Sequence, residues 1–162
     1  MADTVQLLDK ADEALEEWIK SLRGSDLRFT DRDGNVTEIP IYRAFRGATE
    51  IELPIISIVA VRSEQRHVAM PGNYNVEGVI ELVSESRGAD GADHKAWAGR
   101  LEAILDRSDV ETGINALATK PADFTIENWE HQATVRALES ETVDVESAIV
   151  HRFEWEMHAF AS

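Results

Sequence analysis

The chain has 162 residues, of which 31 are acidic and 16 basic, so its formal net charge at pH 7 is -15. Its length is typical of one domain, and 43% hydrophobic and 29% charged residues are typical of a globular fold, which predicts a single domain over residues 1–162. The charge disfavours general binding to nucleic acid or anionic lipid, and the lack of cysteine excludes disulfides, thiol nucleophiles and cysteine-bound metals.

Nothing in the sequence predicts contact with a membrane. The longest strongly apolar run, Leu53 to Val61, is too short to cross a bilayer. The N-terminal residues lack a basic region followed by an apolar one, so we expect no secretory signal.

The first predicted element is an amphipathic helix over residues 4–22. Thr4 is a suitable N-cap, and Gly24 supplies a left-handed stop. Apolar residues recur at three- and four-residue steps on one stripe, while acidic residues mostly occupy the other face. The stripe consists of Val5, Leu8, Ala11, Leu15, Trp18, Ile19 and Leu22.

Residues 25–62 read as strands. The turn signal Asp33-Gly34-Asn35 predicts a hairpin between residues 27–30 and 36–39, because Gly and Asn accept positive φ at little cost. Extended chain follows at residues 41–45. The β-branched run 55–61 is typical of a strand that is covered on both faces.

A polar loop is expected at residues 63–73, followed by the clearest strand of the chain. Between Tyr74 and Val83, apolar residues at even positions alternate with a partly polar odd-numbered face. Residues 84–92 read as a loop, and Asp90 or Asp93 is expected to cap a second helix at about 92–107. Trp97 lies on the inner stripe of that helix.

The remaining chain predicts a short helical turn at 114–117 and then strands at 124–126, 134–138 and 148–160. Strands come in runs and do not alternate strictly with helices. This order favours an α+β fold, a mixed and mainly antiparallel sheet with two amphipathic helices packed on one face.

No residue pattern identifies a reaction, so we expect no catalytic residues, no cofactor and no metal site. No two histidines have the i, i+4 spacing of a helical metal site, and scattered surface or rim positions are the expectation for the five. Because the chain has so many acidic residues, adjacent carboxylates arise by chance and do not indicate a catalytic acid–base pair. The sequence also lacks the Gly-x-Ser-x-Gly motif of a serine nucleophile. The spacing of the glycines at 88 and 91 matches neither the dinucleotide-binding motif nor the P-loop, so we expect this segment to be a loop that only joins a strand to a helix.

Four side chains are candidates for a contact between subunits. Trp129 lies between polar neighbours, and the terminal strand alternates Phe153, Trp155 and Met157 with polar residues. The sequence predicts that the terminal strand is an unpaired edge, along which a second copy could extend the sheet.

The order of these elements resembles small structural proteins of tailed bacteriophages, of the tail-terminator and head-tail joining (tail completion) type. The resemblance spans nearly the whole chain and rests on element order and local similarity. The segments that carry it are the helix 5–22, Leu53-Pro54, the strand 74–82, the helix segment 94–101, residues 109–117 before Phe124-Thr125-Ile126, and the terminal strand ending at Phe160.

The resemblance implies a structural virion protein and no enzyme. Such proteins form a ring, commonly a homohexamer, that caps the tail tube and joins the connector. The implied partners are further copies of the chain together with tail tube and connector proteins. The implied location is the virion, and the host cytoplasm during assembly. Sequence-specific binding to nucleic acid is not expected, and acidic loops such as 31–35 and 63–73 could line a lumen that does not retain DNA.

A second hypothesis from another class stays open. The chain could be a small α+β enzyme or ligand-binding domain with a pocket near residues 84–94, since that connection lies next to His94. A ring-sized mass in solution would favour the first hypothesis, whereas a monomer or dimer with a polar pocket would favour the second.

Overall fold

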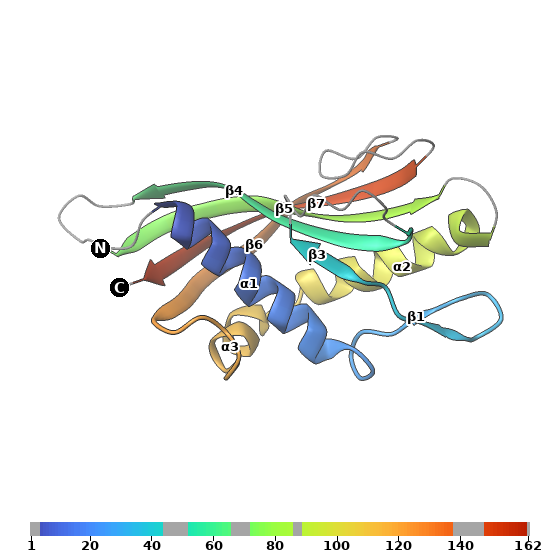
Figure 1. The fold of residues 1–162 in the computed structure, drawn as a ribbon, viewed down its shortest axis with the longest axis horizontal. Helices are drawn as coiled ribbons and strands as arrows, with labels where there is room; N and C mark the ends of the chain where they lie inside the picture. Colours follow the sequence, from blue (N-terminus) through green and yellow to red (C-terminus); the bar gives the residue numbers. More distant parts are fainter. Residues whose placement is uncertain (1–3, 44–51, 66–71, 86–88, 138–147, 162) are drawn as a thin grey trace.

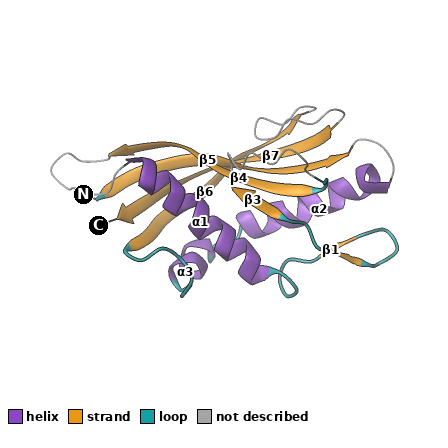
Figure 2. Cartoon of the chain, in the orientation of Figure 1, coloured by secondary structure: helices purple, strands orange, loops and turns teal. Residues whose placement is uncertain are grey.

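The computed structural model describes residues 4–43, 52–65, 72–85, 89–137 and 148–161. It is an α+β fold in which three helices lie on one side of a five-stranded sheet, and a small two-stranded hairpin extends from the body (Figures 1 and 2). The sheet is mixed but mainly antiparallel, as expected. Its strand order is β3-β4-β5-β7-β6, and only the β3–β4 pairing is parallel.

The first helix, α1, spans Thr4–Leu22, which are the predicted bounds. Gly24 follows with a φ of 81°, in the left-handed region that only glycine enters without strain. Leu15 and Ile19 of the predicted stripe are buried, and the helix packs against β3 and β4. Leu7, which the predicted stripe does not include, is buried as well, and so are Asp12 and Glu16, which the sequence assigned to the polar face. This helix therefore follows from local sequence alone.

The predicted hairpin is also present. Strands β1 (Phe29–Thr30) and β2 (Val36–Thr37) pair antiparallel in a separate sheet. The carboxylate of Asp31 accepts hydrogen bonds from the N–H groups of Asp33 and Asn35, both at 2.9 Å, and so holds the turn. Trp97 Nε1 donates to the carbonyl of Thr30 at 2.9 Å, which ties the hairpin to the second helix.

Strand β3 spans Ile41–Arg43, within the extended chain predicted at 41–45. The next two strands are longer than the sequence predicted, since β4 spans Ile55–Gln65 and β5 spans Asn73–Glu85. Residues 63–65 therefore belong to β4 and not to a loop, because they pair with the start of β5. Residues 66–71 and Phe45 lie outside the described residues.

Helix α2 spans Ala89–Leu105, and a short helix α3 spans Val110–Asn115. The prediction of a loop over 84–92 is wrong at both ends, since β5 extends to Glu85 and Asp90 and Asp93 lie within α2 instead of capping it. The short helical turn lies a few residues earlier than predicted.

Strand β6 (Phe124–Ala137) is one strand where the sequence predicted two, and β7 spans Ala148–Ala161. The register of β6 against β7 shifts twice, between Glu127 and Glu130 and between His131 and Ala133. Each shift inserts one residue, which breaks the two-residue alternation on which strand prediction depends. Leu138 lies outside the described residues.

The main core lies between the helices and the sheet, on what we call the helix side. Trp18, Trp97, Phe153 and Trp155 are all buried there. Side chains alternate along a strand, so the neighbouring residues point to the opposite face, which we call the far side. A small second cluster of Ile55, Val83, Ala148 and Val150 is buried on the far side, beside Tyr42, Leu53 and Ala137.

Candidate functional site

The terminal strand β7 is an interior strand, so the prediction that it forms an unpaired edge is wrong. It pairs with β5 on one side and with β6 on the other, along nearly its whole length. The two edges of the sheet are β3 and β6. Alternation along a strand reports its two faces but says nothing about which strands flank it, and this is why the sequence suggested a wrong edge.

Three of the four interface candidates are core residues. Phe153, Trp155 and Met157 have exposed fractions of 0% and belong to the helix-side core. Their side chains cannot touch a second subunit from the surface of this fold. A place just behind such a contact stays a prediction, and a Trp155→Ala variant would report on stability before it reported on assembly.

The fourth candidate, Trp129, joins β6 to the helices. Its indole stacks on Trp155 with ring centroids 5.7 Å apart and lies 6.4 Å from the Trp18 ring. Its Nε1 donates to the carbonyl of Leu105 at 2.8 Å, and its backbone N–H donates to Glu111 at 2.8 Å. The side chain is only partly buried, so part of it is accessible to a partner.

The N-terminal half of the β6 edge is closed by side chains. The amide of Asn115 donates to the carbonyl of Ile126 at 2.8 Å and accepts from its N–H at 2.9 Å, as a neighbouring strand would. Lys120 Nζ donates to the carbonyl of Phe124 at 2.6 Å. With the Glu111 contact, these side chains satisfy an edge that would otherwise offer its backbone to other chains.

The last four residues of the same edge, 134–137, have no such cover within the described part of the chain. Among the residues that the structure describes, none bonds to the outward backbone of this segment. Val135 is 37% exposed and is one of the few large hydrophobic side chains with an exposed surface. The open part of the β6 edge is therefore short and lies at one end of the strand.

Part of the far side of the sheet is strongly acidic. The strand register places Glu77, Glu156 and Glu130 directly across three neighbouring strands. Beside them is a hollow of about 260 Å³, whose lining includes Val61, Gly78 and Trp155. Arg62 Nη1 lies 3.8 Å from Glu77, and Gln132 donates to Glu156, so two of these carboxylates have partners of their own. The remaining negative charge of this face repels phosphate.

Two histidines meet although the sequence suggested scattered positions. His94 Nδ1 lies 2.7 Å from the hydroxyl of Ser84, and His94 Nε2 lies 2.7 Å from His151 Nδ1. Burial lowers the pKa of His94 to about 4, with further lowering from the charges of His151 and Arg136. Burial is also the main cause of the lowered pKa of His151.

This cluster holds α2 against β5 and β7, and no sequence signal could have found it, because the two histidines are 57 residues apart. Ser84 and His94 have exposed fractions of 0% and 1%, so the hydroxyl cannot reach a substrate in this conformation. The second hypothesis expected a ligand pocket near residues 84–94, and the structure has a buried polar cluster at that place. Residues 86–88 lie outside the described residues.

The other histidines are separate from this pair. His131 Nδ1 lies 2.6 Å from the carboxylate of Asp106, and His158 Nδ1 lies 2.8 Å from the side-chain amide of Asn128. His67 is outside the described residues. Within the described part of the chain, no three His, Asp or Glu side chains are grouped as metal ligands.

A buried carboxylate lies where α1 meets the sheet. Asp12 accepts a hydrogen bond from the N–H of Ala60 at 2.6 Å, next to the irregular register of β4. Burial raises its pKa to about 7, although the Ala60 hydrogen bond lowers it in part. One turn later, Glu16 pairs with Lys20 at 2.6 Å and with Arg43.

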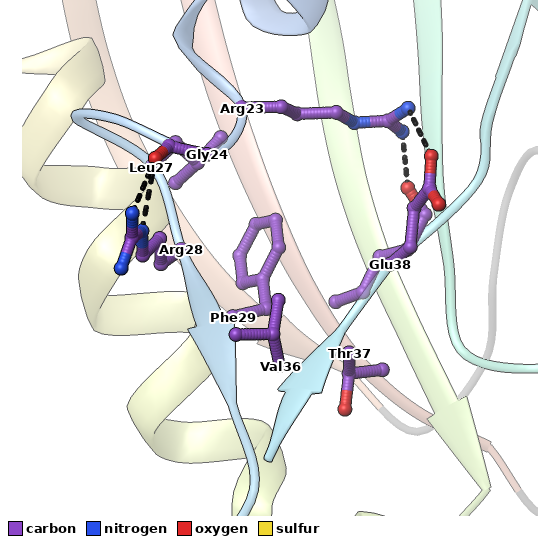
Figure 3. Close-up of a pocket in the computed structure, with 9 residues that line it drawn as sticks. Arg23, Gly24, Leu27, Arg28, Phe29, Val36, Thr37 and Glu38 are labelled. Carbon is purple, nitrogen blue, oxygen red and sulfur yellow. Dashed lines mark hydrogen bonds and ion pairs between the residues drawn. The ribbon is translucent and has the colours of Figure 1, made fainter. Parts of the chain in front are cut away.

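A surface hollow of about 250 Å³ lies between the end of α1 and the β1–β2 hairpin (Figure 3). Leu27 and Phe29 form its apolar floor, and Val36, which is 65% exposed, stands at its rim. Arg28 donates twice to the carbonyl of Gly24, at 2.9 and 2.7 Å, and Arg23 donates to the carbonyl of Ile39. The hollow can accept an apolar side chain, since its guanidinium groups already have partners.

Comparison with protein-family models gives no match for this chain, and comparison with curated proteins gives none either. Among the described residues, no helix combines the length and apolar character needed to cross a membrane.

Proposed function

We propose that the chain is a structural subunit that assembles with copies of itself into a ring of the bacteriophage tail-terminator or head-tail connector type. One observation carries the proposal: β3 and β6 are the two edge strands of the sheet, and Asn115, Lys120 and Glu111 close the first half of the β6 edge, while no described residue bonds to the outward backbone of 134–137. An edge protected in one half and open in the other is suited to controlled pairing between subunits.

The charge of the chain is consistent with this role. A ring through which DNA passes works better when its wall does not hold phosphate, and a net charge of -15 meets that need. Of the two loops considered for a lumen, 31–35 is the tip of the β1–β2 hairpin. Most of the other, residues 66–71, lies outside the described residues.

Mass measurement tests the proposal directly. Native mass spectrometry and sedimentation velocity of the purified chain should give a closed oligomer, and negative-stain images should contain particles with a central hole. A monomer at every concentration up to about 10 mg/ml would contradict the proposal, which requires contacts between copies with dissociation constants in the range that such concentrations reach.

Among the described residues, the observation that bears on the ligand-binding alternative is the hydrogen-bonded cluster of Ser84, His94 and His151, of which only His151 is partly exposed. A Ser84→Ala variant separates the two hypotheses. If the cluster is structural, the variant loses stability but assembles as the unchanged chain does.

A further inference from the structure

The two edge strands of the main sheet, β3 and β6, share rows of the strand register. Tyr42 on β3 pairs with Ser57, which pairs with Glu81 on β5. Glu81 pairs with Arg152 on β7, and Arg152 pairs with Val135 on β6. One continuous row therefore crosses all five strands, from Tyr42 at one edge to Val135 at the other.

The rows on either side of this one also cross all five strands. Following the pairings from Ile41 across the sheet leads to Arg136, and following them from Arg43 leads to Thr134. The whole of the three-residue strand β3 thus occupies the rows that end, at the opposite edge, in the uncovered segment of β6.

The strand directions also match. β3 runs parallel to β4, and the three following pairings are antiparallel, so β6 runs opposite to β3. If a second copy is placed beside the first in the same orientation, its β3 lies antiparallel to β6 of the first copy. Antiparallel pairing gives well-aligned hydrogen bonds and suits short segments.

We propose that neighbouring copies join head to tail, with β3 of one copy adding to the 134–137 segment of β6 in the next, in the register that places Tyr42 opposite Val135. This inference rests on the proposed ring function and names its interface. Tyr42 and Val135 both point to the far side, where an aromatic and a β-branched residue form a favourable cross-strand pair. Val135, exposed in the single chain, is covered in the assembly.

The coincidence of the rows bears on the shape of the assembly. Two different patches meet in this contact, so it repeats from copy to copy and produces either a closed ring or an open helix. Because the two edges end in the same rows, each added copy continues the sheet without a shift along the strands.

Cysteine cross-linking tests the register, and the natural lack of cysteine makes the test clean. In a chain with both Tyr42→Cys and Val135→Cys, cross-strand Cβ atoms would lie about 4.5–5.5 Å apart, close to disulfide range. Mild oxidation should give a ladder of covalent dimers, trimers and larger species on a denaturing gel. Each single variant alone should stay uncrosslinked, and a mixture of the two should give dimers only.

A matched control uses the covered half of the same strand. Thr125 is exposed on β6 but lies in the half closed by Asn115 and Lys120, so Thr125→Cys combined with Tyr42→Cys should give no ladder. Since Tyr42 is partly buried, a second test leaves it intact. Val135→Arg places a charge in the proposed contact and should weaken association by at least about tenfold, while the far-UV circular dichroism stays unchanged.

The outcomes are distinguishable. Dimers formed by Val135→Cys alone would mean that two β6 edges meet around a two-fold axis, which would overturn the inference. Ring particles without a ladder would overturn the interface but leave the proposed function standing. A chain that is monomeric in every sample would remove both.

Discussion

At the scale of single residues, Gly78 is the position where the sheet leaves least room. A Cβ atom at this site would lie 2.8 Å from the Cα of Ala60 and 2.5 Å from Cζ2 of Trp155, and closer still to the carbonyl oxygen of Val59. The first and last of these are backbone atoms, which cannot move aside without disturbing β4. We expect Gly78→Ala to lower the free energy of unfolding by about 2–3 kcal/mol, measured by urea denaturation.

Gly99 provides the matched control for that measurement. It is exposed within α2, and a Cβ atom there would meet no other atom within 4 Å. Alanine is the better helix former, so Gly99→Ala should raise stability by about 0.5–1 kcal/mol. Equal effects of the two substitutions would show that the packing around Gly78 is looser than described.

The buried histidine makes folding depend on pH. Burial lowers the pKa of His94 to about 4 from its ordinary value of 6.5, so the unfolded chain binds the proton more readily. The stability that His94 contributes is complete above pH 6.5 and is lost as the pH falls toward 4. Relative to a His94→Asn variant, the chain should lose about 2–3 kcal/mol over this range in thermal or urea unfolding. A constant difference between the two proteins would contradict the burial of a neutral imidazole.

Asp12 should make the stability of the fold depend on pH with the opposite sign. Its pKa is raised to about 7 from 3.8, so the folded chain binds the proton more readily, and the resulting stability is lost as the pH rises from 3.8 to 7. Asp12→Asn keeps an oxygen to accept from Ala60 and removes the buried charge. We expect the variant to be more stable than the unchanged chain by about 2–4 kcal/mol at pH 8, with little difference near pH 4. Unfolding experiments that show the reverse pH trend would contradict this account.

At the scale of elements, α3 protects a strand edge through its side chains. Asn115 provides both a donor and an acceptor to Ile126. Asn115→Ala leaves that N–H and carbonyl unpaired, which should cost about 1–2 kcal/mol and speed hydrogen exchange at the Ile126 amide. Thr112→Ala, an exposed substitution in the same helix, should leave both unchanged. If Ile126 exchanges at the same rate in all three proteins, α3 does not close the edge.

The elements differ in how far the sequence predicts them. Helix α1 and strand β5 follow from local periodicity, because each buries one continuous apolar face. Strand β6 does not, because two bulges interrupt its alternation, and Asn128 has a φ of 53° at the first of them. The edges of the sheet cannot be predicted in this way, since they depend on pairings such as β5 with β7, far apart in the sequence.

The residues of the candidate site also differ in how far the local sequence predicts them. The sequence predicts Trp129 as an interface residue because a large aromatic residue in a polar segment is unusual. The prediction of Phe153, Trp155 and Met157 rests on an alternation that a core strand shares with an edge strand. The uncovered segment 134–137 and the His94–His151 pair carry no local signal, because both are defined by neighbours from distant parts of the chain.

At the scale of the whole molecule, charge sets the conditions under which copies can meet. Each copy carries a net charge of -15, so like copies repel one another at low ionic strength. The proposed contact joins the backbones of β3 and β6 and places Tyr42 opposite Val135. It includes no ion pair that added sodium chloride would weaken. Salt therefore screens the repulsion and leaves the attraction in place.

If the proposed ring forms, its population should rise as sodium chloride is raised from about 20 mM to about 300 mM, because the screening length falls from about 20 Å to about 6 Å over this range. Sedimentation velocity at a fixed protein concentration measures the change. The Val135→Arg variant should stay dissociated at both salt concentrations, since screening cannot restore the lost strand contact. A ring that dissociates with added salt would instead mean that copies meet through opposite charges, and the acidic far side around Glu77 and Glu156 would then be the surface to test.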